Sequence, residues 1–173
     1  MSVTIKRVFC IICFICFSFS QESYPEKLPT KHLNKHQQYN IRYLSNIRDG
    51  LHSINEDIIS KSIKLNFDKN YDLYLLRYKL EKNDKYRIIF KINNFPKNTK
   101  LYISNSQNQY LGPITKESIN DNNNFISGLI IGNIIEIQLL HKKNNSIPEI
   151  IAESIIREKN YIINNKESNY NIK

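Results

Sequence analysis

Two stretches between Tyr71 and Phe95 alternate apolar and polar side chains, and they constrain the fold more than any other part of the chain. One face of the first stretch carries Tyr74, Leu76, Tyr78 and Leu80. One face of the second carries Tyr86, Ile88, Phe90 and Ile92. A period of two is the side-chain period of a strand with one buried face. Because the polar connector at residues 81–84 is short, the sequence predicts two antiparallel or closely neighbouring strands.

Further short segments continue this pattern. Predicted strands span residues 62–67, 100–104, 110–111, 125–131, 134–141 and 149–156, separated by turn residues. In the strand at 134–141, we expect Ile135, Ile137 and Leu139 to face inward and His141, at the strand end, to be exposed. Many closely spaced strands without a crossover helix predict an all-β fold, an antiparallel β-sandwich of jelly-roll type.

The region before the sandwich has a different pattern. Residues 21–38 contain Pro25 and Pro29 and little apolar sequence, which is typical of an extended leader. From residue 39 to 63, apolar residues recur at threes and fours, so we expect a short helical or turn-rich segment. The predicted organisation is a leader or linker over 21–61, the β-sandwich over 62–157 and a polar tail over 158–173.

The first twenty residues have the parts of a secretory signal peptide. Lys6 and Arg7 precede an apolar run at 8–19, and small residues before Gln21 predict cleavage between Ser20 and Gln21. The apolar run is short for a membrane span, although an uncleaved anchor stays open as the alternative. We therefore expect a secreted protein, extracellular, periplasmic or at the cell surface, without stable membrane insertion after signal removal.

The cysteines and the paired histidines do not predict a metal site. All three cysteines lie inside the signal, so the mature chain is expected to have no disulfide and no thiol chemistry. His32 and His36 stand four apart, but Leu33 follows His32 where the zinc-protease helix motif has Glu. The histidine pair is expected to be solvent-exposed, and no cofactor or metal is predicted.

The charge and the carboxylates do not point to nucleic acid or to a known active site. The net charge of +9 permits binding to acidic surfaces, but the basic residues are spread along predicted outer strand faces of an exported chain. None of the four glycines stands in a G-x-S-x-G context. Carboxylates are scattered over predicted turns and outer faces, and a catalytic pair among them is the less favoured alternative. We predict no catalytic residue and a non-enzymatic chain.

Four segments in order resemble one protein family. They are FKINNFP at 90–96, LYISN at 101–105, LGPIT at 111–115 and GNIIEI at 132–137. This order is similar to the non-catalytic N-terminal region of secreted lysyl endopeptidase-type, trypsin-like serine proteases. Two positions depart from that pattern, since Tyr74 stands where the family usually has Trp and Gln138 replaces a late acidic residue. The family's catalytic residues belong to a later domain, so none is carried onto this sequence.

The resemblance implies a β-sandwich accessory domain or pro-region. Such a domain is expected to assist, inhibit or recruit a trypsin-like protease, or to bind another extracellular protein. The alternative is an adhesion or glycan-binding module, since β-sandwiches often present aromatic side chains to ligands. In either case the candidate interaction surface consists of Tyr71, Tyr102 and Tyr110, provided that these side chains are exposed.

Overall fold

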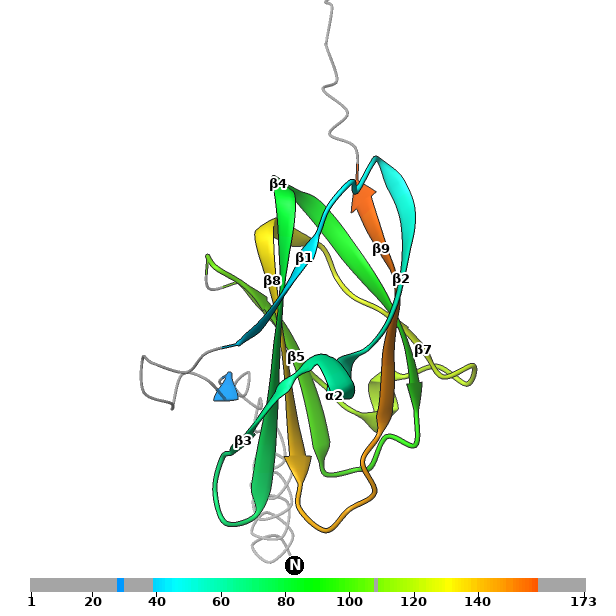
Figure 1. Cartoon of the computed structure of the whole chain (residues 1–173). Coiled ribbons are helices and arrows are strands. Elements are labelled where there is room, and N and C mark those ends of the chain that lie inside the picture. Colours follow the sequence, from blue (N-terminus) through cyan, green and yellow to red (C-terminus); the bar gives the residue numbers. More distant parts are fainter. Residues whose placement is uncertain (1–27, 30–38, 108, 159–173) are drawn as a thin grey trace, which may run out of the picture.

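The computed structural model describes residues 28–29, 39–107 and 109–158, and strands dominate it (Figure 1). In chain order the elements are β1 (Asn40–Leu44), β2 (Gly50–Asp57), α2 (Ile58–Lys61), β3 (Ile63–Asn66), β4 (Tyr71–Asn93), β5 (Thr99–Asn105), β6 (Tyr110–Ile114), the 3-10 helix η2 (Lys116–Ser118), β7 (Asn124–Ile126), β8 (Ile130–Lys142) and β9 (Glu149–Glu158). The predicted all-β class is confirmed.

The prediction of two separate strands between residues 71 and 95 is wrong, because β4 is one strand of 23 residues. Its first part pairs with β8 and its second part with β9. Residues 80–83 bulge out of the ladder, since Lys79 is opposite Ile134 whereas Asp84 is already opposite Gly132. The connector contains neither Gly nor Pro and no residue with a positive φ, so the chain bends there without reversing.

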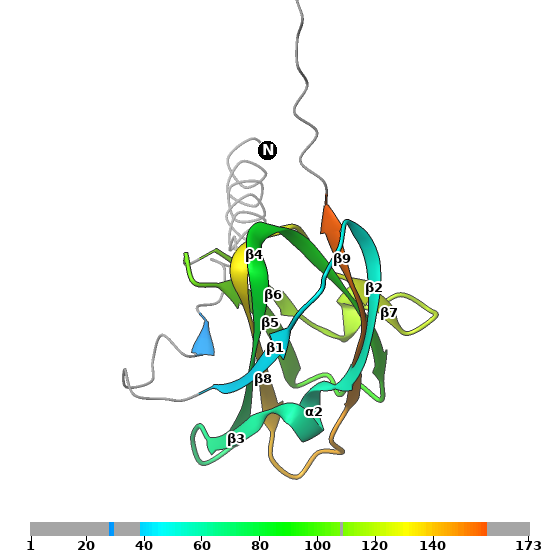
Figure 2. The same ribbon diagram turned by 45° about the horizontal axis from the view of Figure 1, so that its top comes forward.

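The bend in β4 joins two β layers, which face each other in Figure 2. In one layer β4 is followed by β8, β5 and β6, while β1 and β3 lie along its other edge. In the other layer β4 is followed by β9 and β2, and β7 also pairs with it. The result is a sandwich-like arrangement in which one long strand belongs to both layers.

The core lies between these layers and follows the predicted alternation. The predicted inward residues of β4 and β8 all belong to one buried cluster, together with Leu101, Ile103, Ile150 and Ile155. The strands β3, β5 and β9 also lie close to their predicted positions. Gly132 does not end a strand as expected, because β8 runs through it from Ile130 to Lys142.

The strands of the folded domain begin before residue 62, the predicted start of the β-sandwich. Residues 40–57 form β1 and β2 instead of a leader with a helix, and only α2 is helical in the expected stretch. Asp57 caps that helix by accepting hydrogen bonds from the backbone N–H groups of Ile59 and Ser60. The side chain of Ile58 is fully buried in the core. The apolar residues at threes and fours therefore belong partly to strand faces, which the helical interpretation missed.

The strand β1 has an unusual position. It runs parallel to β4, with Arg42 opposite Tyr78, whereas every other strand pair of the described residues is antiparallel. Four of its five residues are exposed. It therefore contributes backbone pairing to β4 while burying little side-chain surface.

Candidate functional site

The three predicted interaction tyrosines do not form one exposed surface. Tyr102 is only 1% exposed, and both Tyr71 and Tyr110 are half-buried. Tyr71 begins β4 and Tyr110 begins β6, and the strands β8 and β5 lie between these two. The predicted cleavage site, Ser20 and Gln21, and the histidine pair, His32 and His36, lie outside the described residues.

The strands β1 and β2 are mostly exposed. We call the two strands and the loop that joins them the β1–β2 seam. A loop at residues 45–49 joins the two strands, yet they do not pair with each other: β1 pairs with β4, and β2 pairs with β9. Figure 1 shows them diverging from this loop toward α2. Within the described part of the chain, each of the two strands thus has one edge without a neighbouring strand.

Side-chain interactions, and not backbone hydrogen bonds, connect β1 with β2 and α2. Arg42 of β1 donates to Oε1 of Glu56 on β2, with the terminal guanidinium nitrogen at 2.6 Å. Asn40 of β1 donates to the carbonyl of Lys61 at the end of α2. Partly buried apolar side chains of β1, the loop, β2 and α2 pack against the core: Leu44, Ile47, Ile54 and Ile59. The two edges are therefore held together by interactions that a competing strand can replace.

Near the ion pair, two polar atoms are buried without a hydrogen-bond partner among the described residues: the hydroxyl of Tyr78 and Oε2 of Glu56. Burial, with a further contribution from the Glu56 carboxylate, raises the pKa of Tyr78 far above its usual range. The hydrogen bond to Glu56 raises the pKa of Arg42. The Tyr78 hydroxyl therefore stays neutral.

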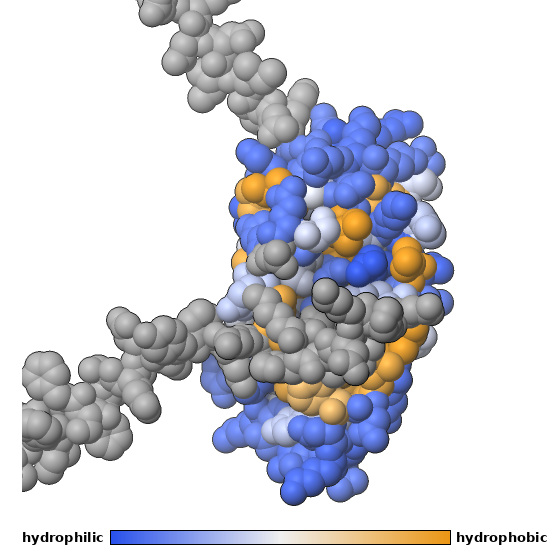
Figure 3. Space-filling model, turned by 90° about the vertical axis from the view of Figure 1, so that its left-hand side faces the viewer, coloured by the Kyte–Doolittle hydropathy of each residue, from blue (hydrophilic) through white to orange (hydrophobic). Residues whose placement is uncertain are grey.

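Apolar side chains are exposed on the two seam strands. Ile41 and Tyr43 of β1 are 43% and 70% exposed, and Leu51 of β2 is 63% exposed. The Lys79 ammonium of β4 lies 5.5 Å from the centre of the Tyr43 ring, a cation–π contact. Figure 3 shows the side of the molecule that lies on the left in Figure 1. Apolar side chains lie across the middle of this side, and polar side chains lie at both of its ends. Exposed apolar residues on edge strands indicate an interaction surface.

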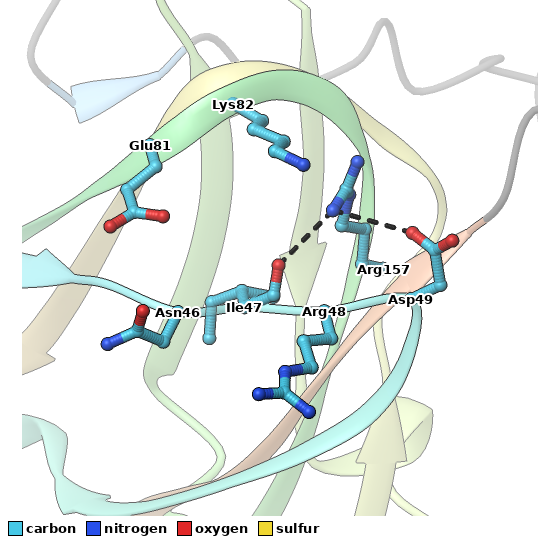
Figure 4. Close-up of a pocket in the computed structure, with 7 residues that line it drawn as sticks. All are labelled: Asn46, Ile47, Arg48, Asp49, Glu81, Lys82 and Arg157. Carbon is cyan, nitrogen blue, oxygen red and sulfur yellow. Dashed lines mark hydrogen bonds and ion pairs between the residues drawn. The ribbon is translucent and has the colours of Figure 1, made fainter.

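At the loop end of the seam lies a pocket of about 380 Å³, shown in Figure 4. Arg157, near the end of β9, lines this pocket. Its guanidinium donates a hydrogen bond of 3.2 Å to the Ile47 carbonyl and lies 3.4 Å from the Asp49 carboxylate. The same guanidinium binds Asp84 at the β4 bend, 2.7 Å away, and lowers the pKa of that carboxyl. In Figure 4 the Lys82 side chain points toward Arg157. The pocket is thus polar and rich in cations.

A second polar cluster lies at the far end of β4, beside a pocket of about 580 Å³. Asp72 is opposite His141 in the ladder and forms an ion pair with Lys64 at 2.9 Å. His141 is 2% exposed, so the prediction that it is exposed is wrong. Its Nδ1 lies 3.0 Å from the hydroxyl of Thr99, which is fully buried. Because no substrate can reach that hydroxyl, this Thr–His–Asp group fits a structural role better than nucleophilic catalysis.

A third polar group lies on the outer face of β4 and β8. Arg77 forms an ion pair with Glu136, and its guanidinium stacks 4.4 Å from the Tyr39 ring centre. The Tyr39 hydroxyl donates to Glu136 and accepts from Gln138, which is fully buried. Tyr39, just before β1, is thereby fixed to the sheet, which helps to position β1.

Sequence reasoning missed the seam because residues 40–57 were interpreted by their i, i+3 and i+4 spacing. A period of two was also present, since His52, Ile54 and Glu56 alternate with Leu51, Ser53 and Asn55. In the structure the first set is partly buried and the second is exposed, but only Ile54 of the first set is apolar, so the sequence carries this alternation weakly. No sequence signal shows that β1 and β2 lie apart from each other.

The described residues contain no helix long and apolar enough to cross a membrane, and no group of three or more His, Cys, Asp or Glu side chains placed to hold a metal ion. Comparison with known proteins finds no family model and no curated protein sequence that matches this chain.

Proposed function

We propose that the chain is a secreted, non-catalytic β-sandwich-like domain that binds another protein, as an accessory or pro-region of a trypsin-like serine protease does. The observation that carries this proposal is the pair of strand edges at the β1–β2 seam that no strand of the described residues covers, with exposed apolar side chains on both strands. Open edges and exposed apolar groups are both features that proteins normally cover, and a partner protein covers both at once.

The resemblance to the protease N-terminal region supports the fold more directly than it supports the partner. Its LYISN segment lies in β5, LGPIT runs through β6, and GNIIEI lies in β8. Leu101, Ile103 and Ile137 from these segments are fully buried. The similar positions are therefore core positions, and the protease partner rests on the proposed family relationship alone.

Two assays test the proposed function. In the first, the mature chain from Gln21 onward is titrated into a purified trypsin-like protease of lysyl specificity, and binding and residual activity are measured. Saturable binding with inhibition or stabilisation of the protease is expected. In the second, the chain alone is incubated with peptide and ester substrates, and no turnover is expected. Reproducible hydrolysis that a single Ser, Asp or His substitution abolishes contradicts a non-catalytic role.

Two further observations separate the proposal from its alternative. A protease reading frame adjacent to the coding sequence supports the accessory role. On a glycan array, saturable sugar binding that depends on the half-buried Tyr71 or Tyr110 supports the adhesion module instead, whereas Tyr102 is too buried to make a first contact.

A further inference from the structure

We infer that the β1–β2 seam binds one extended segment of the partner protein, which pairs with the free edge of β1 and carries acidic residues among alternating aliphatic ones. This inference rests on the proposed protein-binding function and names the chemistry of the bound segment. Strand addition to an open sheet edge gains affinity from main-chain hydrogen bonds and specificity from alternate side chains.

The backbone of β1 is the better template of the two seam edges. Its five residues pair with β4 in a continuous register from Asn40 to Leu44. In contrast, the ladder of β2 shifts between Ser53 and Glu56, and Asn55 within that bulge has a φ of 50°. A bulge interrupts the row of donors and acceptors that a further strand needs, so β2 is a protected edge and β1 is not.

The side chains beside β1 favour an apolar, alternating segment. Ile41 and Tyr43 lie on the outer face of β1, because they are paired with Arg77 and Lys79 of β4 and not with its core residues. A strand added to β1 places every second side chain beside these two residues.

The charges around the loop end of the seam favour an acidic segment. Arg48, Lys79 and Lys82 lie there together with one carboxylate, Glu81, and none of these four has an ion-pair partner within the described part of the chain, so unpaired cations outnumber unpaired carboxylates three to one. The carboxylates of Asp49 and Asp84 are already engaged by Arg157. Without Lys6 and Arg7 of the predicted signal, the mature chain carries a net charge of +7, so an acidic segment is also attracted at longer range.

A peptide-binding experiment tests the inference directly. The probe is a fluorescent ten-residue synthetic peptide of alternating Val and Glu, titrated against the mature chain and followed by anisotropy. We expect saturable binding that weakens with added salt, because exposed charge pairs are screened. The same peptide with Lys in place of Glu is expected to bind at least about tenfold more weakly, since it meets like charges.

Backbone pairing is tested with the Val–Glu peptide N-methylated at alternate residues, which removes the N–H donors facing β1. We expect a loss of at least about tenfold in affinity, as several main-chain hydrogen bonds are lost. Hydrogen exchange adds a second readout, since the amides of residues 40–44 that point away from β4 become protected only if a strand pairs there. Equal binding of the methylated peptide, or unchanged exchange in β1, overturns the inference.

Protein variants locate the site. Tyr43→Glu places a like charge beside the acidic peptide and is expected to weaken binding about tenfold or more. The matched control is Ile126→Glu, because Ile126 is 57% exposed on β7, away from the seam. Equal weakening by both variants overturns the assignment to the seam.

Protease binding that Tyr43→Glu leaves unchanged preserves the proposed function but refutes this site. A dimer of the chain that Tyr43→Glu abolishes assigns the edge to a second copy and also refutes the inference.

Discussion

Phe90 and Lys91 are adjacent in β4 and lie on opposite faces of it. Phe90 is fully buried and its ring centre lies 6.3 Å from that of Phe125, whereas Lys91 is exposed. We expect Phe90→Ala to cost about 3–5 kcal/mol of unfolding free energy, because it leaves a cavity in the core. Lys91→Ala is expected to cost less than about 0.5 kcal/mol. Urea melts measure both, and a larger cost for Lys91→Ala contradicts the register of β4.

Tyr78 is a residue at which a smaller side chain should stabilise the protein. Its hydroxyl is buried without a hydrogen-bond partner, at a cost that the phenylalanine side chain avoids. We expect Tyr78→Phe to raise the free energy of unfolding by about 1 kcal/mol, measured by chemical denaturation. A destabilisation of similar size shows instead that the hydroxyl donates to Glu56.

His141 should make stability depend on pH. Burial lowers its pKa below the ordinary value of 6.5, and the Lys64 ammonium opposes protonation as well, against the attraction of Asp72. Above about pH 6.5 the imidazole is neutral in both states and contributes nothing. As the pH falls below this value, the unfolded chain takes up the proton more readily, so stability is lost until the folded-state pKa is passed.

The matched variant for this prediction is His141→Gln, which keeps polar groups near Thr99 but does not titrate. The unfolding free energy of the wild type, relative to this variant, is expected to fall between pH 7 and pH 5. A constant difference across that range contradicts the titration of His141.

At the scale of elements, the bend of β4 is the feature that sequence patterns did not predict. The core-facing residues of both halves of β4 were predicted correctly, because alternation places them on one face, although Leu73 and Leu75 on the other face are buried as well. Alternation says nothing about which strand lies alongside, so it cannot distinguish a hairpin from a bent strand. The absence of Gly and Pro from residues 81–84 was the available signal against a tight turn.

The Arg157–Asp84 ion pair holds this bend against the end of β9. Both side chains are 12% exposed, and two guanidinium nitrogens lie 2.7 and 2.8 Å from one Asp84 oxygen. We expect Asp84→Asn to cost about 1–3 kcal/mol, because a mostly buried guanidinium loses its charged partner. Asp49 is 46% exposed on its longer contact with Arg157, so Asp49→Asn is expected to cost less than about 0.5 kcal/mol.

Thermal and urea melts of these two variants measure the difference. Equal costs mean that the bend is held by packing and not by this ion pair. The low pKa of Asp84 adds a second check. The wild type should have a higher unfolding free energy than Asp84→Asn at neutral pH, and this difference should decline once the pH falls below about the ordinary value of 3.8.

At the scale of the whole molecule, the candidate site depends on the part of the chain that the sequence placed outside the domain. Core strands could be predicted because their burial produces strong alternation. Residues 40–57 are mostly exposed, so their pattern is weak and fits a helix as well as an edge strand. Edge strands are weakly encoded because few of their side chains are buried, and open edges are also where partners bind.

The two domain boundaries make different predictions for a shortened chain. If the domain began at residue 62, removing residues 1–61 would leave a complete sandwich. In the structure, that deletion removes β1, β2 and the fully buried Ile58, together with the partly buried side chains of residues 44–59 that pack against the core. We therefore expect the chain of residues 62–173 to lose cooperative unfolding and to bind a hydrophobic dye, as expanded states do.

The matched control removes residues 159–173, a polar tail with few apolar residues, from the mature chain. This control is expected to unfold cooperatively with a midpoint close to that of the full mature chain, as circular dichroism and calorimetry measure. A cooperative transition in the 62–173 chain, with native-like near-ultraviolet circular dichroism, shows that β1 and β2 are dispensable for folding. In that case the seam is an appendage to an independent sandwich, and the edge of β4 beneath β1 becomes the template on which a partner strand is to be sought.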